Sequence, residues 1–274
     1  MIRFRVYLLA SALLLTGLTA TAQRRVAGNT LLQPELQAEL ALANNDYLLL
    51  GLGAVSEPGS GRAFYGGQLR LGYEHFWSEQ WSGGATLRLQ RQYRQGAGDF
   101  LGQPGNVIPG VFVRHLGKIG GFNFRQRLGV EYAISTPKIY FANQDDRASA
   151  RLRLDVDRIF PLGGTVALRP RVSYEAAAYL RFQRDENQLK ERTIDFGVLR
   201  AEVGVRLSPH VDVTPWVAWQ TQYVVYVPQY DALTGRQISG GRTNVVFPVV
   251  GLDARFTLFS GRATQERLQL PSQH

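Results

Sequence analysis

The feature that most constrains this chain is a strict alternation of apolar and polar side chains over unusually long segments. Residues 122–134 carry Phe122, Phe124, Leu128 and Val130 at even positions, with polar or small residues at the odd ones. A period of two indicates a β-strand with one apolar face. The same alternation returns in residues 148–157, 166–176, 199–207 and 211–227. Such lengths exceed the usual globular strand of about five or six residues and match the roughly 9 to 11 residues that cross a bilayer at a tilt.

These segments predict an all-β, antiparallel transmembrane β-barrel of about ten strands. We place the strands at residues 47–56, 64–77, 81–93, 106–116, 121–134, 147–158, 165–180, 194–207, 211–227 and 243–259. Leu36 to Leu42 alternates more weakly and is either an extra short strand or a periplasmic lead-in, so twelve strands are also open. Bacterial barrels have an even strand count, and ten strands place both chain ends in the periplasm.

The connections support the same fold. Short turns interleave with long polar loops, and the long loops are at 94–105, 135–147, 181–193 and 228–242. Outer-membrane barrels have short periplasmic turns and longer external loops. Aromatic residues lie beside the short turns, where an interfacial girdle belongs: Trp77, Trp81, Phe122 and Phe160. A soluble β-sandwich is the alternative, but its strands would be shorter.

The N-terminus has the three parts of a secretory signal peptide. Arg3 and Arg5 precede an apolar stretch from Val6 to Leu15, and small residues then end at Ala22. The expected organisation is a signal peptide at 1–22, a lead-in or short strand at 23–46, the barrel at 47–259 and a polar tail at 260–274. This organisation predicts export to a bacterial outer membrane, with membrane lipid and the barrel-assembly machinery as partners.

Charge and composition exclude several kinds of site. The chain has 31 basic and 22 acidic residues, and removing two arginines with residues 1–22 leaves 29 − 22 = +7. For an exported chain this excess favours lipid headgroups over nucleic acid as the counterion. There is no cysteine, and the four histidines, His75, His115, His210 and His274, lack a metal-binding spacing. We therefore predict no metal and no cofactor.

The polar faces of three consecutive strands have complementary charges. One register for the first hairpin sets Arg125 opposite Asp157, Arg127 opposite Asp155, and Glu131 opposite Arg151. One register for the next sets Asp157 opposite Arg169, Asp155 opposite Arg171, and Arg151 opposite Glu175. We predict a salt-bridge ladder inside the barrel. It is either a charged filter for ions or a stabilising network that fills a narrow lumen, and a filled lumen is the reading we favour.

The sequence shows no catalytic constellation. No nucleophile lies close to His75, His115 or His210, and Asp145 and Asp146 in a predicted external loop have no histidine beside them. We therefore predict that the protein is not an enzyme.

Short motifs resemble a known family. The pattern Arg125-Gln126-Arg127-Leu128 with Glu131, then Arg151-Leu152-Arg153-Leu154, then Pro170-Arg171 with Glu175 resembles the outer-membrane barrel family called domain of unknown function 2490, over residues 120–227. The resemblance implies fold and location and supplies no activity. Residues 251–259, which end at Phe259, are similar to the C-terminal insertion signal of barrel proteins, except that a polar tail follows.

Three function classes follow from these expectations. The first is a structural barrel or a narrow gated pore. The second is a barrel enzyme that acts on lipid or peptide at the outer rim. The third is a binding barrel whose long loops hold an external ligand.

Overall fold

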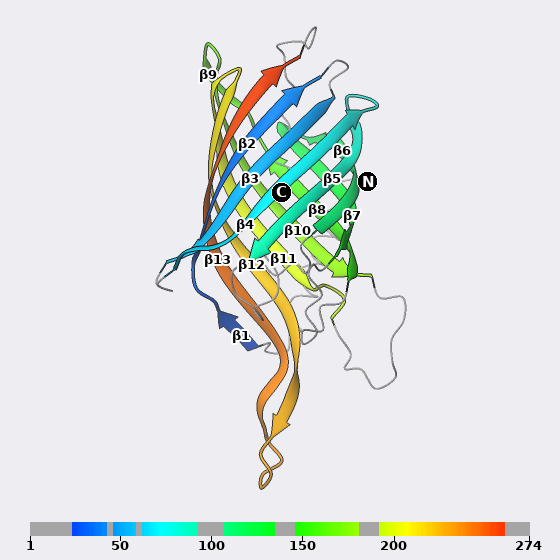
Figure 1. The fold of residues 1–274 in the computed structure, drawn as a ribbon, viewed down its shortest axis with the longest axis vertical. Coiled ribbons are helices and arrows are strands. Elements are labelled where there is room, and N and C mark those ends of the chain that lie inside the picture. Colours follow the sequence, from blue (N-terminus) through cyan, green and yellow to red (C-terminus); the bar gives the residue numbers. More distant parts are fainter. Residues whose placement is uncertain are drawn as a thin grey trace.

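The computed structural model describes residues 24–42, 46–58, 62–92, 107–134, 146–180 and 192–260, and the fold in these ranges is one closed β-sheet. Eleven of the thirteen strands form the barrel wall, because β13 pairs with β2 and closes the sheet (Figure 1). The wall strands are β2 (Leu31–Ala41), β3 (Tyr47–Glu57), β4 (Arg62–Phe76), β5 (Trp81–Gln92), β6 (Val107–Ile119), β7 (Phe122–Ala133), β8 (Arg147–Asp157), β10 (Val166–Tyr179), β11 (Phe196–Ser208), β12 (Val211–Tyr230) and β13 (Gln237–Phe259). The predicted fold class is confirmed, and the ten predicted strands are β3 to β8 and β10 to β13.

Two short strands complete the sheet. β1 (Arg24–Ala27) pairs in parallel with an earlier part of β13 than β2 does, at residues 243–246. β9 (Phe160–Gly163) pairs with the start of β10. The described ranges contain no helix long and apolar enough to cross a membrane.

The seam between β2 and β13 explains the odd strand count. These two strands run parallel, whereas the other neighbours in the wall are antiparallel. The segment that alternates around Leu36 is therefore a full wall strand of eleven residues and not a lead-in. The expected even strand count is therefore wrong. The wall also does not begin and end on the same side of the barrel, as ten strands would require, because β2 starts at the opposite end from the end of β13.

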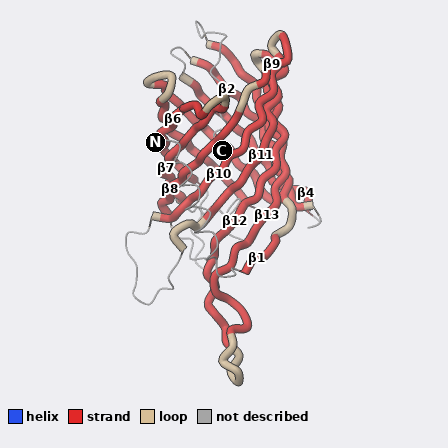
Figure 2. The backbone as a smooth tube through the Cα atoms, turned by 180° about the vertical axis from the view of Figure 1, so that it is seen from behind, coloured by secondary structure: helices blue, strands red, loops and turns tan. Residues whose placement is uncertain are grey.

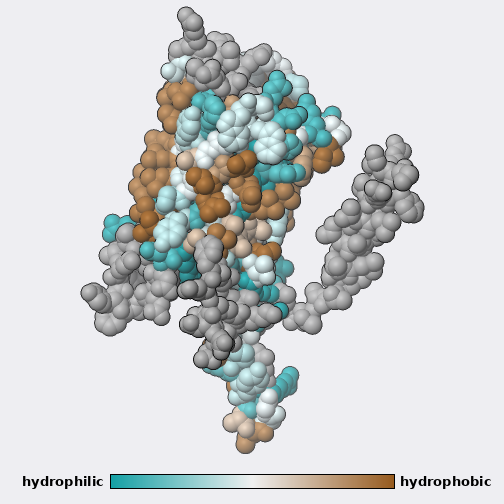
Figure 3. All heavy atoms as spheres, turned by 90° about the vertical axis from the view of Figure 1, so that its right-hand side faces the viewer, coloured by the Kyte–Doolittle hydropathy of each residue, from teal (hydrophilic) through white to brown (hydrophobic). Residues whose placement is uncertain are grey.

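The barrel is polar inside and apolar outside, as its alternating strands require. On β2, Gln33, Glu35, Gln37 and Glu39 are at most 5% exposed, while Leu36 between them is 58% exposed. Apolar residues cover much of the wall in Figure 3. Water-soluble proteins bury apolar side chains and seldom bury charges, so this burial pattern is the reverse of theirs.

The short turns lie at one end of the barrel, and the strand ends that the longer connections join lie at the other, which we call the long-loop end (Figures 1 and 2). Trp77, Trp81, Phe122 and Phe160 are at the short-turn end, and each is between 42% and 59% exposed. The backbone N–H of Trp77 donates to the carbonyl of Trp81 at 3.1 Å and closes one turn. The aromatic residues therefore lie where the sequence places its girdle.

The connection between β12 and β13 differs from the expected loop at 228–242. The two strands continue as a hairpin that projects past the barrel at the long-loop end (Figures 1 and 2). Residues 223–227 are rich in tyrosine and valine, which favour strands. Gly240 and Gly241 on β13 both have a positive φ of 78°, and the register of β12 shifts opposite them, between Tyr226 and Gln229. The pairing of the two strands continues past this irregularity. The other three predicted loops lie largely outside the described residues, as do residues 1–23 and 261–274.

Candidate functional site: the barrel lumen

The lumen is lined by arginines and carboxylates that the strand alternation points inward. At the short-turn end Arg114 Nη1 lies 2.7 Å and 2.9 Å from the two carboxylate oxygens of Glu74, and Ser82 Oγ donates to Glu74 at 2.6 Å. Glu74 is fully buried and Arg114 is 2% exposed. Arg255 bonds Gln37 at 2.9 Å and contacts Glu39 at 3.3 Å. These contacts tie together strands that are distant in sequence.

A second cluster lies on β7, β8 and β10. Asp157 Oδ2 forms ion pairs with Arg125 Nη1 at 2.6 Å and with Arg169 Nη2 at 3.2 Å. Asp155 is 3.0 Å from Arg153 and 3.7 Å from Arg171. Arg171 continues the network to Glu202 on β11, at 2.6 Å.

A third cluster lies in the half of the lumen nearer the long loops. Glu131 is 2.6 Å from both Arg88 and Arg151, and Arg151 also reaches Glu175 at 2.5 Å. Arg127 stands over the ring of Phe112, with its guanidinium carbon 4.2 Å from the centroid. This cluster consists of Arg88, Glu131, Arg151 and Glu175. We call it the upper cluster; the long-loop end of the barrel, to which it is nearer, points downward in Figure 1.

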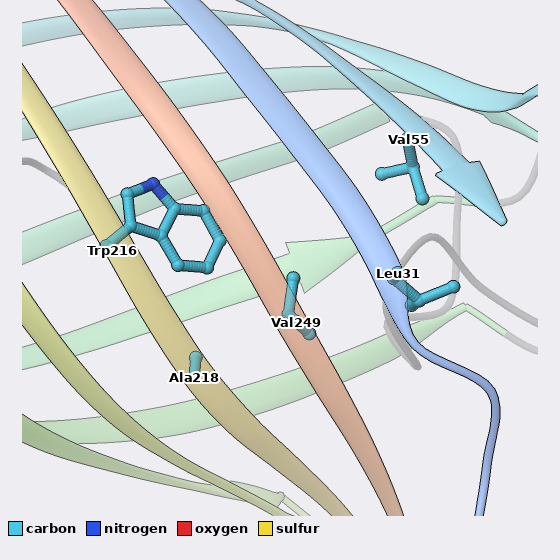
Figure 4. Packing of buried hydrophobic residues seen from close by; sticks show 5 residues of the cluster. All are labelled: Leu31, Val55, Trp216, Ala218 and Val249. Atoms are coloured by element: carbon cyan, nitrogen blue, oxygen red, sulfur yellow. The ribbon is translucent and has the colours of Figure 1, made fainter. Parts of the chain in front are cut away.

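Trp216 on β12 is an inward aromatic residue that the sequence analysis did not single out. Its indole Nε1 donates to Asp253 at 2.8 Å, and Arg200 stacks on the ring at 4.0 Å. Figure 4 shows Trp216 with Ala218 and Val249 on the inner face of β12 and β13. A Cβ on Gly251 would lie 2.1 Å from Trp216 Cε2, so only glycine leaves room for the ring.

The predicted ladder forms most of its ion pairs, but in a different register. Five of the six predicted pairs are in contact. The sixth was Arg127 with Asp155; in the structure Arg127 stacks on Phe112, and Asp155 contacts Arg153 and Arg171. The residues directly opposite one another are Arg125 and Asp155 in the first hairpin, and Arg171 and Asp157 in the second. Both predicted registers are therefore wrong by two residues.

Diagonal contacts explain why the ion pairs survive the register error. Residues displaced by two positions across a strand pair are about 7–8 Å apart, within reach of a long arginine side chain. Arg125 thus reaches past its direct neighbour to Asp157.

Several lumen residues beyond the ladder were missed. Arg70, Glu74, Arg88 and Arg114 lie on strands that were correctly placed, and the same parity rule assigns them to the inner face. Their partners lie 35 to 43 residues away in sequence, so no single hairpin suggests the pairs.

The charged side chains leave a small cavity in the lumen, of about 100 Å³. Six arginines and two glutamates are among its lining residues: Arg70, Arg88, Arg127, Arg151, Arg153, Arg200, Glu131 and Glu175. A space of this size holds a few water molecules and is far smaller than the lumen of a wide porin. Positive charge predominates around it.

Other candidate positions form no second site in the described residues. His75 Nδ1 is 2.8 Å from Asp46, and His210 Nδ1 is 2.9 Å from the carbonyl of Thr257. No group of three potential metal ligands occurs in the described part of the chain. Asp146 directly precedes β8, whereas Asp145 and His274 lie outside the described residues.

Comparisons with known proteins assign no family to this chain. No protein-family model matches the chain, and no curated protein matches it. Among solved structures, one described as the NanC porin in a rhombohedral crystal form is 10% identical, with a TM-score of 0.41, covering 81% of this chain and 91% of that one. What this lumen does is therefore inferred from its own residues.

Proposed function

We propose that this chain is an outer-membrane β-barrel that forms a narrow pore, held nearly closed by the arginine–carboxylate network of its lumen. The observation that carries the proposal is the small size of the lumen cavity, about 100 Å³, which is lined by the upper cluster and neighbouring arginines. The outward apolar residues support a lipid environment, because transmembrane barrels present an apolar band to lipid. A closed barrel also pairs all of its backbone N–H and C=O groups internally, which a bilayer requires.

The upper cluster is the constriction in this proposal. Arg88, Glu131, Arg151 and Glu175 come from β5, β7, β8 and β10, which lie on one side of the wall, and their side chains are only 11–15% exposed. An ion that passes must disturb these contacts. Since arginines outnumber glutamates around the cavity by six to two, the pore favours anions over cations.

The proposal keeps the further expectations from the sequence. It includes export by the N-terminal signal, insertion by the barrel-assembly machinery, membership of the family called domain of unknown function 2490, and no enzymatic activity. Supporting the insertion step, residues 251–259 with the signal-like pattern are the final part of β13, which closes the barrel.

Electrical recording in planar bilayers tests the proposal. We expect the wild-type barrel to pass a small current and to show a reversal potential of anion-selective sign in a salt gradient. Replacing all four residues of the upper cluster by serine removes two positive and two negative charges, so net charge is unchanged. We expect this variant to conduct several-fold more and to select anions more strongly, because no glutamate then lines the cavity.

The matched control is Gln80→Ser, an exposed turn residue outside the lumen, which leaves the current unchanged. A wild-type barrel that opens as a wide, unselective channel would contradict the proposal. So would a folded serine variant with the wild-type current, or a cation preference in either protein.

A further inference from the structure

The outer face of the barrel has a hollow of about 710 Å³ that spans β8 to β13. Its bed is a row of short side chains in register on adjacent strands, Val156, Val172, Ala201, Val217 and Val250. We call this hollow the outer groove.

Prolines and phenylalanines shape the rest of the outer groove. Pro170 and Pro215 lie in it one row nearer the short-turn end. Phe122 and Phe160 border it at that end. The hollow is open toward the outside of the barrel, and the short side chains of its bed leave space that leucine would fill.

One cation lies at the short-turn end of the outer groove. Arg158 is exposed, follows the last residue of β8 and lines the groove. Its guanidinium carbon is 5.8 Å from the ring centroid of Phe122 and 5.2 Å from that of Phe160. Within the described ranges no carboxylate forms an ion pair with Arg158, whereas the inward arginines around it on β7 and β10, Arg125, Arg169 and Arg171, each contact one.

We propose that the outer groove and Arg158 bind one glycerophospholipid with an anionic headgroup. The acyl chain lies along Val172 and Ala201 toward the middle of the wall, and Arg158 donates hydrogen bonds to the phosphate. A guanidinium suits phosphate because it donates in a planar fork. The proposal rests on the proposed function, since it requires the wall to face lipid.

The direction of the outer groove supports this ligand. The charged and aromatic residues lie at the short-turn end, and the apolar bed extends from there toward mid-wall. A phospholipid of the periplasmic leaflet has the same order, headgroup outside and chain inward. The short turns are periplasmic by the rule for such barrels, so the groove faces the phospholipid leaflet of the membrane.

Native mass spectrometry of the refolded full chain tests the site, with phosphatidylglycerol and phosphatidylcholine of identical acyl chains as probes. We expect one phosphatidylglycerol to be retained in preference to phosphatidylcholine. Arg158→Gln reduces that preference about fivefold, the size expected for one basic residue at a membrane surface, and Arg158→Lys keeps part of it. Ala201→Leu fills the bed and lowers retention of both lipids.

Arg147→Gln is the matched control. Arg147 is an exposed arginine that stacks on an aromatic ring, Tyr179 at 5.1 Å, but it is at the other end of β8. Equal lipid preference in wild type and Arg158→Gln would overturn the proposal, as would the same loss in Arg147→Gln. Insertion into vesicles is measured on the same samples. A chain that does not insert contradicts the proposed function, whereas an inserted chain without lipid preference contradicts this site alone.

Discussion

Replacing Glu74 by glutamine is expected to lower the free energy of unfolding by about 3–5 kcal/mol, because it leaves the buried charge of Arg114 without its partner. Glu74 is fully buried, and both of its carboxylate oxygens lie within 2.9 Å of Arg114 Nη1. The measurement is a urea titration of the barrel in lipid vesicles, followed by tryptophan fluorescence.

Two further variants make this test specific. Glu74→Gln combined with Arg114→Gln removes both charges and is expected to lose less stability than the sum of the single variants. Glu79→Gln, in an exposed turn, is the control and stays within about 0.5 kcal/mol of wild type. If Glu74→Gln behaved like Glu79→Gln, the lumen would be hydrated enough to solvate Arg114, and the buried network would be disproved.

Gly251→Ala is expected to cost about 1–3 kcal/mol, the usual range for overpacking. The added methyl group would lie 2.1 Å from the Trp216 ring and 2.6 Å from the backbone oxygen of Gln33. The ring must then move away from Asp253 and Arg200, so the fluorescence of Trp216 changes together with the unfolding midpoint.

Gly204→Ala provides the matched control on the inner face of β11. A Cβ there meets its nearest atoms at 3.6 Å, which is ordinary contact. Trp216→Phe in the Gly251→Ala background is expected to recover part of the stability, because the smaller ring leaves room for the methyl group. Equal stability of the two alanine variants would show that Trp216 does not pack against Gly251.

The sequence predicts which face each side chain occupies much better than it predicts which residues are neighbours. Side chains alternate with a period of two, so an error of two residues in register leaves every residue on its correct face. Arg125, Glu131, Asp155 and Glu175 therefore line the lumen as expected, although both assumed registers are wrong.

The register error of the second hairpin has an identifiable cause. The predicted register centres the turn on Gly163, whereas the structure closes it with Gly163 opposite Val166, around Gly164 and Thr165. Gly163 and Gly164 both have positive φ, and a β-bulge follows between Val166 and Ala167. Moving a turn by one residue shifts the paired positions by two, and sequence alone does not distinguish which glycine begins the turn.

The closure of the barrel is the other feature that the sequence leaves open. Gln33, Glu35, Gln37 and Glu39 alternate with Leu32, Pro34, Leu36 and Ala38, but the proline and the alanine weaken the apolar face. Nothing in this local pattern states that the strand pairs with β13, more than 200 residues later, or that it runs parallel to it. Such pairing is a property of the closed sheet.

The most direct test of the account uses two tryptophans of β12 that lie on opposite faces of the wall. Trp219 points outward and is 44% exposed, and Trp216 points inward and is 5% exposed. In vesicles of brominated phosphatidylcholine, a variant whose only tryptophan is Trp219 should be strongly quenched, and one that keeps only Trp216 should be nearly unquenched. Equal quenching of both, or a chain that folds as a monomer in buffer and leaves both unquenched, would contradict a barrel with its apolar face in lipid and its charges inside.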